Sequence, residues 1–127
     1  MSEPFDPAAP LILVQARLWG PGREAGVQLA LDTGAVRSVI SVEVATVLGF
    51  EPAAAAARTR ILTASGEVLV PVLVMDRLEA IRQARCAFPV LCHSLPPATR
   101  LDGLPGLDFV RGHRLVADFR AGLLSLE

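Results

Sequence analysis

The chain has 127 residues, of which 52% are hydrophobic and 20% charged, and its formal net charge is -1. This length predicts a single domain with a core of its own. The near-neutral charge, and the absence of basic runs interleaved with aromatic residues, argue against nucleic acid as a partner.

The N-terminal residues lack the features of a targeting sequence. The segment MSEPFDPAAP carries acids where a signal peptide carries positive charge, and the apolar run LILV that follows is far shorter than a membrane span. We therefore expect a cytoplasmic protein with no membrane partner. Residues 1–10 are predicted to be an N-terminal extension, and residues 11–127 to form the domain.

Short apolar segments separated by turn residues dominate the chain and predict a mainly β fold. Residues 11–18 and 27–32 are expected to be strands, joined through the glycine-containing connection WGPGREAG. In the second of these strands, VQLALD, alternation places the valine and the leucines on one face. Asp32 lies on the other, less apolar face.

A short helix is expected over residues 41–49, SVEVATVLG. Ser41 is a favourable N-cap, Glu43 lies in the first turn, and Gly49 occupies the position just past the helix end where glycine is preferred. These local signals predict both ends of the helix.

The segment TRILTASGEVLVPVLVMDRL has two apolar β-rich arms around a turn at Ser65 and Gly66, which is typical of a hairpin. Pro71 predicts that part of this hairpin lies at a sheet edge or a bulge. Residues 86–92 are expected to be another strand, followed by a second short helix that ends at Gly112 and by a C-terminal hairpin.

Two cysteines and two histidines raise the question of a metal site. Cys86, Cys92, His93 and His113 fit no common structural zinc spacing, because paired ligands usually come two to four residues apart. We predict two reduced cysteines that face the core, two surface histidines, and no metal ligands.

The stretch LALDTGAVRSVIS, residues 29–41, places one carboxylate at the end of an apolar run, in the tripeptide Asp-Thr-Gly. Burying an unpaired carboxylate is costly, so Asp32 either lies at the surface or has a partner that uses it. In a hydrolase that activates water, Asp32 would be the acid or base, Thr33 would offer a hydroxyl to hold the loop, and Gly34 would allow close backbone approach. A Leu-Pro-Gly turn before the second helix accompanies the motif.

With these features the chain, from about Leu11 to Leu126, resembles the retropepsin-like aspartic proteases, in particular the stand-alone bacterial domains of that family. The resemblance implies a mainly β, closed acid-protease barrel with one or two short helices and a flap hairpin, and no cofactor. It implies a catalytic turn of Asp32, Thr33 and Gly34. The implied substrate-binding and flap residues are Ala35, Thr63, Ala64, Ser65 and Gly66. The element that supports the catalytic loop matches Leu104, Pro105 and Gly106.

The sequence departs from the family pattern in two places. Pro105 stands where the family usually has a branched aliphatic residue. Retroviral members also carry an acid soon after Asp-Thr-Gly-Ala that pairs with an arginine after the apolar-apolar-Gly element, whereas here Val36 or Arg37 takes the place of the acid, and Leu107 and Asp108 follow the turn. Arg37 and Asp108 could form this pair with the signs exchanged, or Asp108 could favour a helix N-terminus.

The chemistry of an aspartic protease needs two carboxylates, and the chain has one Asp-Thr-Gly. Asp102 and Asp108 lie near the second turn, but neither precedes Thr-Gly or Ser-Gly, and we predict solvation or capping roles for them. The second carboxylate is therefore expected from Asp32 of a second copy across a two-fold axis. The sequence thus predicts a homodimeric aspartic endopeptidase that acts on peptide or protein substrates.

Two other functions remain open at this point. The same fold could serve as a dimerisation or peptide-binding module with little or no turnover, since a fold does not determine a function. A serine hydrolase built on Ser41 or Ser65 with His113 is a third possibility, although the chain has no Gly-x-Ser-x-Gly elbow.

Overall fold

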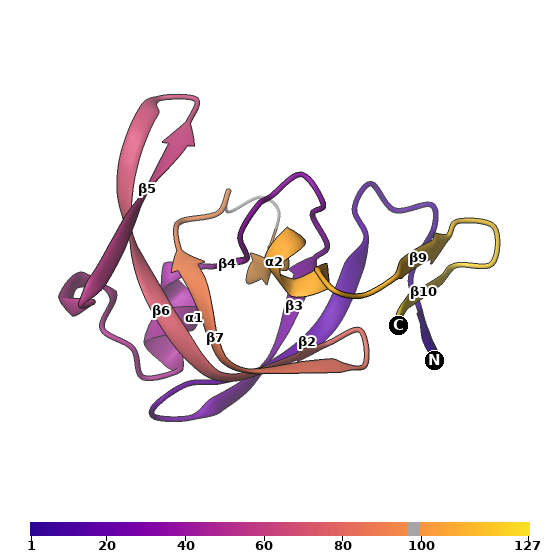
Figure 1. Cartoon of the computed structure of the whole chain (residues 1–127), viewed down its shortest axis with the longest axis horizontal. Coiled ribbons are helices and arrows are strands. Elements are labelled where there is room, and N and C mark those ends of the chain that lie inside the picture. Colours follow the sequence, from indigo (N-terminus) through magenta and orange to yellow (C-terminus); the bar gives the residue numbers. More distant parts are fainter. Residues whose placement is uncertain (97–99) are drawn as a thin grey trace.

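A computed structural model describes residues 1–96 and 100–127, and the fold is mainly β (Figure 1). The described residues form ten strands, two short α-helices and one short 3-10 helix, η1. In chain order these elements are β1 (Ser2–Pro4), β2 (Leu13–Trp19), β3 (Glu24–Ala30), β4 (Val39–Ile40), α1 (Val42–Val47), η1 (Pro52–Ala54), β5 (Ala57–Thr63), β6 (Gly66–Ala80), β7 (Gln83–Cys92), β8 (Gly103–Leu104), α2 (Leu107–Val110), β9 (Leu115–Asp118) and β10 (Leu123–Leu126).

The larger sheet has the strand order β2-β3-β8-β4-β7-β6-β5, and β2 also pairs with β6. This additional pairing joins Ala16 to Ala80 and Trp19 to Arg77, and it closes six strands into a barrel while β5 stays outside. The prediction of a mainly β, closed barrel with short helices is confirmed. None of the helices in the described part of the chain is long and apolar enough to cross a membrane.

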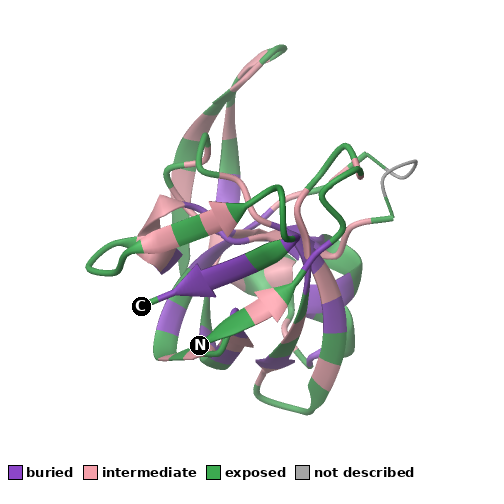
Figure 2. Cartoon of the chain, turned by 90° about the vertical axis from the view of Figure 1, so that its right-hand side faces the viewer, coloured by how far each residue is buried: buried purple, intermediate pink, exposed green. Residues whose placement is uncertain are grey.

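The core fills the inside of the barrel, and α1 covers it from one side. Buried residues lie in the body of the molecule, whereas the tip of the β5–β6 hairpin is exposed or half-buried (Figure 2). The side chains that are almost fully buried include Leu18, Leu29, Ile40, Leu48, Met75, Leu78 and Phe109. Helix α1 begins as predicted, because the Ser41 hydroxyl oxygen accepts a hydrogen bond from the Val44 N–H at 3.1 Å. Gly49 has a φ of 96° just past the end of the helix, which favours glycine.

The β5–β6 hairpin projects from the body of the barrel (Figure 1). Thr63 pairs with Gly66 at its tip, and Ala57 pairs with Val72 at its base. Strand β7 joins β6 only from Val72 onwards, so residues 66–71 of β6 pair with β5 alone. Pro71 therefore lies where β6 has an open edge, as predicted, and its missing N–H costs no ladder hydrogen bond there.

A second sheet of three strands, in the order β1-β10-β9, contains both ends of the chain. Ser2 pairs with Ser125, and Phe5 is 8% exposed, with its ring edge-on to Phe119 at a centroid distance of 5.2 Å. Residues 2–5, which the sequence analysis assigns to an extension, thus contribute a strand and a core side chain. They do so because β10 offers them a partner strand that lies far away in the sequence.

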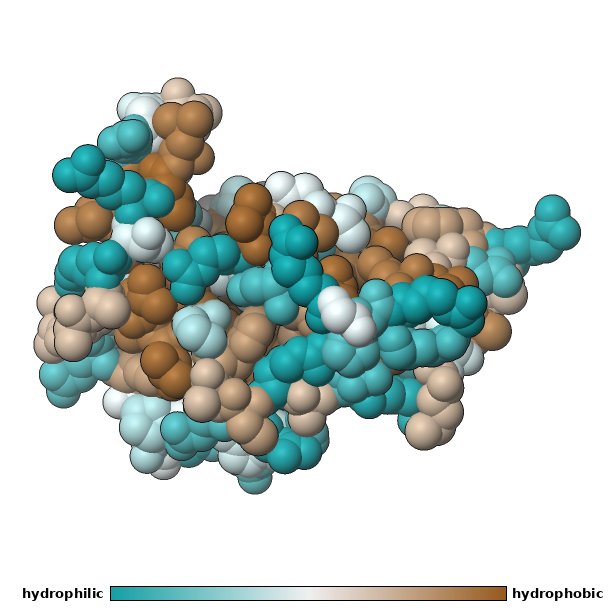
Figure 3. Space-filling view, viewed as in Figure 1, coloured by the Kyte–Doolittle hydropathy of each residue, from teal (hydrophilic) through white to brown (hydrophobic). Residues whose placement is uncertain are grey.

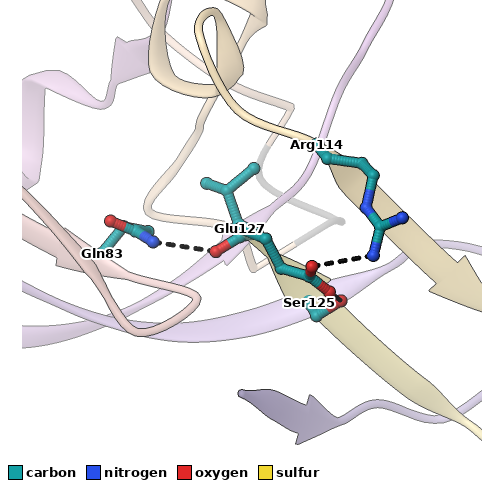
Figure 4. A network of polar contacts seen from close by, with 5 residues as sticks. Gln83, Arg114, Ser125 and Glu127 are labelled. Carbon is teal, nitrogen blue, oxygen red and sulfur yellow. Dashed lines mark hydrogen bonds and ion pairs between the residues drawn. The ribbon is translucent and has the colours of Figure 1, made fainter.

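The β6–β7 turn holds this terminal sheet against the barrel. The Gln83 side-chain amide donates a hydrogen bond to the Leu126 carbonyl at 2.8 Å, and the Arg82 guanidinium donates to the Ser2 carbonyl at 3.1 Å. Beside it, Arg114 forms an ion pair with Glu127 at 2.8 Å (Figure 4). This ion pair lowers the pKa of Glu127, with the hydrogen bond from Arg114 as the largest cause.

The two cysteines differ in their exposure. Cys92 faces the core as predicted, and its burial, with a further contribution from Glu43, raises its thiol pKa. The prediction for Cys86 is wrong, because this residue is exposed. Its neighbour Ala87 has a φ of 48°, which interrupts the alternation of β7 and turns Cys86 away from the core.

Candidate active site

Strand β8 lies between β3 and β4, and this order brings the two motifs of the sequence together. The Asp32 N–H donates a hydrogen bond to the Pro105 carbonyl at 3.0 Å, and the Leu107 N–H donates to the Ala35 carbonyl at 2.8 Å. A third bond, from the Asp108 N–H to the Val36 carbonyl, measures 3.3 Å. The Asp-Thr-Gly loop is therefore tied, backbone to backbone, to the Leu-Pro-Gly segment.

The loop also orients the carboxylate of Asp32. Its Oδ1 accepts a hydrogen bond from the Gly34 N–H at 2.9 Å, and its carbonyl accepts one from the Ala35 N–H at 3.2 Å. Asp32 is half-buried, and Thr33 and Gly34 are exposed. Within the part of the chain that the structure describes, neither Asp32 Oδ2 nor the Thr33 hydroxyl has a hydrogen-bond partner. A fixed carboxylate thus reaches the surface with one oxygen available.

Gly106 lies where the two segments touch most closely. A Cβ at this position would be 2.6 Å from the Ala35 carbonyl oxygen and 2.9 Å from the Arg37 carbonyl oxygen. Real Cβ atoms essentially never come that close to another heavy atom, so only glycine fits here without a shift of the backbone.

A side-chain network next to Gly106 was not anticipated from the sequence. Ser38 is 1% exposed, and its Oγ donates a hydrogen bond to Asp108 Oδ1 at 2.7 Å and accepts one from the Gly106 N–H at 3.0 Å. The Ser38 N–H also donates to both oxygens of Asp108, at 2.9 and 3.0 Å. No sequence signal marked Ser38, which lies 70 residues from Asp108.

This network overturns the exchanged ion pair that the sequence analysis considered. No ion pair joins Arg37 to Asp108 in the described ranges, because Ser38 occupies the carboxylate oxygens of Asp108. Asp108 does lie in the first turn of α2, where an acidic residue is favoured.

The face of the sheet that carries Asp32 is apolar. Val39 pairs with Leu104 on one side and with Leu91 on the other, and Leu91 pairs with Val72. By the parallel register of β3 and β8, Ala30 lies next to Leu104 in the same row. Alternation puts Asp32 on the face of Ala30, opposite the core face that carries Leu29 and Ile40. The carboxylate therefore stands beside a partly exposed apolar floor that leads toward the β5–β6 hairpin.

The hairpin predicted to be the flap stands clear of the body, on the same side as the loop after β3 (Figure 1). At its tip, the Thr63 hydroxyl donates a hydrogen bond to the Gly66 carbonyl at 2.9 Å and accepts one from the Ser65 N–H at 3.2 Å. Gly66 has a φ of 112° and open space around it, and Ala64 is exposed. In the space-filling view, apolar residues cover much of this hairpin (Figure 3). Among the described residues, no hydrogen bond joins this tip to the Asp-Thr-Gly loop.

The serine hydrolase interpretation is wrong. The Ser41 hydroxyl is buried and caps α1, whereas Ser65 lies at the hairpin tip. His113 Nδ1 lies 3.3 Å from an Arg85 guanidinium nitrogen, and across residues 1–96 and 100–127 no hydrogen bond joins it to either serine. Within these ranges neither serine is therefore hydrogen-bonded to a histidine that could act as its base. Likewise, no three His, Cys, Asp or Glu side chains of the described residues come together as a metal site.

A cleft of about 560 Å³ lies away from Asp32, between β1, β2 and the β6–β7 turn. Residues such as Glu3, Arg17, Arg77 and Glu79 line it, and burial raises the pKa of Glu3. The surface around Asp32 therefore does not coincide with this cleft.

Comparisons with known proteins agree with this geometry. Residues 14–109, which run from β2 to α2, match the family described as aspartyl protease. Among solved structures, a retropepsin-like aspartic protease from Rickettsia conorii matches with a TM-score of 0.72 and 20% sequence identity, over 99% of this chain and 88% of that one. No curated protein matches the sequence significantly. At this identity the structural match shows a shared fold.

Proposed function

The chain belongs to the aspartyl protease family and has a retropepsin-like fold, and on this premise we propose that it is an aspartic endopeptidase active as a homodimer. Each copy would contribute one Asp32 to a shared catalytic pair. The proposed catalytic residues are Asp32, Thr33 and Gly34, supported by Leu104, Pro105 and Gly106. We further propose that it acts in the cytoplasm. Residues 11–127 form the proposed protease domain, and β1 of the N-terminal extension pairs with its strand β10.

The engagement of the other nearby carboxylates carries the dimer proposal. Asp102 Oδ2 accepts a hydrogen bond from the Gln28 N–H at 2.9 Å, and Asp108 binds Ser38 with both oxygens. Asp108 thus has both oxygens engaged, and Asp102 lines a separate hollow with side chains of α1, whereas Asp32 lies in the Asp-Thr-Gly loop and reaches the surface. A two-fold axis through the loop would place one residue against its own copy.

In the proposed mechanism, the two carboxylates share one proton, because like charges about 3 Å apart cannot both ionise, as is general for aspartic proteases. The ionised Asp32 takes a proton from water as the water oxygen attacks the scissile carbonyl carbon, and the protonated copy donates a hydrogen bond to the carbonyl oxygen. The C–N bond of the resulting tetrahedral intermediate breaks as a carboxyl group of the pair gives its proton to the leaving nitrogen. No covalent intermediate with the enzyme forms.

The apolar floor beside Asp32 supports a preference for apolar side chains next to the cut. Val39, Leu104 and Val72 are half-buried on that face and would contact such side chains. The proposed flap, Thr63 to Gly66, would cover an extended peptide whose backbone adds hydrogen bonds to the hairpin. We therefore propose unfolded or extended peptide segments as substrates.

Cleavage of a diverse peptide pool at several pH values tests the function. Asp32→Asn should lower the rate by about 10³-fold or more, because an amide cannot act as the base, and should leave the fold and the dimer nearly unchanged. Asp76→Asn, at an exposed carboxylate on β6, is the matched control and should cleave like the wild type. Near-wild-type activity of Asp32→Asn would remove Asp32 from the mechanism.

The pH profile and the oligomeric state separate the proposal from its alternatives. Activity should fall at both ends of the pH range, since a pair that shares one proton fails once both members are protonated or both are ionised. A clearly alkaline optimum, or activity by a chain that sediments as a monomer, would contradict the shared pair. Peptide binding without cleavage at any pH would favour a binding module, for which the unusual Pro105 would be the first residue to examine.

A further inference from the structure

Asp108 holds the far end of the catalytic loop. Its carboxylate accepts three hydrogen bonds from Ser38, two from the N–H and one from the hydroxyl, at 2.7 to 3.0 Å. Ser38 is almost fully buried, so these bonds are shielded from water. Charge-assisted bonds of this kind are stronger than neutral ones.

The loop is thereby clamped at both of its ends to one segment. At the near end, the Asp32 N–H binds the Pro105 carbonyl, and at the far end Asp108 binds Ser38. Ser38 also accepts the Gly106 N–H, so it links Asp108 to the glycine on which the loop rests. Between these ends, the Ala35 carbonyl and the Leu107 N–H add a further bond. Without the Asp108 carboxylate, residues 33–38 would keep, among the described hydrogen bonds to other segments, only the backbone bonds made by Ala35, Val36 and the Ser38 carbonyl, and the bond from the Gly106 N–H to the Ser38 hydroxyl oxygen.

We propose that Asp108 is a positioning residue for the reaction: acting through Ser38, it sets the place of Asp32 without touching the substrate. This inference rests on the proposed protease function. It differs from a helix-capping role, because the hydrogen bonds of its carboxylate go to the loop and not to the free N–H groups of α2.

Kinetics of Asp108→Ala test the proposal. Because a misplacement of about 1 Å at reacting groups can cost about 100-fold in rate, kcat should fall by about that factor while KM changes less than about threefold. Asp108→Asn should recover part of kcat, since its amide oxygen can still accept the Ser38 hydroxyl. Adding Ser38→Ala to Asp108→Ala should lower kcat by less than Ser38→Ala does alone, because the bond between the two side chains is already absent and only the bond from the Gly106 N–H is lost.

Asp102→Ala is the matched control. Asp102 is also a half-buried carboxylate that accepts a backbone N–H, from Gln28, but it lies outside the catalytic loop. The Asp102→Ala variant should lose thermal stability, as Asp108→Ala does, but its kcat should stay near the wild-type value. If kcat falls equally in the two variants, in step with stability, Asp108 is merely structural and the proposal is overturned.

Amide hydrogen exchange gives a second result that does not require turnover. In Asp108→Ala the amides of Asp32 and Leu107 should exchange at least about tenfold faster, while amides in the β2–β3 pairing keep their protection. Unchanged exchange at Asp32 and Leu107 would overturn the proposal. If Asp108→Ala does not fold, Asp108→Asn and Ser38→Ala carry the same comparison. A wild-type chain that cleaves nothing would refute the protease function, and the exchange result would still decide whether Asp108 holds the loop.

Discussion

Replacing Gly106 with alanine adds one methyl group at the contact between the Asp-Thr-Gly loop and the Leu-Pro-Gly segment. Gly106 has a φ of -106° and a ψ of -163°, a conformation that alanine adopts readily, so the backbone angles themselves cost nothing. The new Cβ would lie 2.6 Å from the Ala35 carbonyl oxygen, against the 3.4 Å of ordinary contact. The Ala35 backbone must therefore move.

That movement has a calculable cost. The same Ala35 carbonyl accepts the Leu107 N–H at 2.8 Å, so shifting it weakens this hydrogen bond, worth about 1 kcal/mol. Overpacking a rigid interior adds about 1–3 kcal/mol. We expect Gly106→Ala to lower the free energy of unfolding by about 2–4 kcal/mol, and the melting temperature by roughly 10 °C in a chain of this size.

Urea unfolding at a fixed protein concentration measures this loss, since dimerisation would otherwise change the apparent stability. Gly26→Ala is the control: a Cβ at Gly26 meets nothing closer than an Arg17 guanidinium nitrogen at 3.8 Å, and alanine is the better strand residue. Gly26→Ala should match or slightly exceed the wild type. Equal midpoints for the two variants would refute the argument from close backbone contact.

Three further predictions concern other parts of the molecule. Gly66→Val, at a φ of 112° on an open hairpin tip, should slow peptide turnover in a steady-state assay while the barrel core melts nearly as in the wild type. Iodoacetamide should label Cys86 in the native protein and spare Cys92, as read by mass spectrometry; equal labelling would contradict the burial and raised pKa of Cys92. Arg114 lowers the pKa of Glu127. The ion pair therefore adds to the free energy of unfolding above the ordinary pKa of 4.5, and this contribution is lost as the pH falls through the lowered pKa. Arg114→Gln should therefore lower the melting temperature slightly at neutral pH, and its difference from the wild type should shrink as the pH falls below 4.5; a difference that stays constant would indicate another cause.

Local signals made helix α1 predictable. The hydroxyl of Ser41 acts on the N–H of Val44, three residues away, and Gly49 adopts its positive φ at the helix end. Both effects depend on side chains within one turn of the chain, so the sequence specifies them directly. The barrel and the Asp-Thr-Gly turn were predicted from the resemblance of the motifs to a known family. Such a resemblance indicates which distant segments of the chain pair, whereas the spacing of apolar residues does not.

Contacts across long sequence distances explain what the sequence did not reveal. The family pattern and the opposite charges left an Arg37–Asp108 pair open, but the N–H and the hydroxyl of Ser38 bind the carboxylate of Asp108. Cys86 lies in an apolar strand segment, yet it is exposed next to Ala87, whose φ is positive. Each of these outcomes depends on backbone geometry that forms after distant segments meet.

The pairing of Ser2 with Ser125 makes the two ends of the chain neighbours (Figure 1). A linker of about four residues, the usual length of a hairpin loop, could therefore join Glu127 to Met1 without disturbing the terminal sheet. New ends opened between Ala64 and Ser65 would give a circular permutant that keeps every strand of the barrel and divides only the projecting hairpin. Such a permutant would separate the ability to fold from the ability to close over a peptide, and it would fold with the catalytic loop held as before.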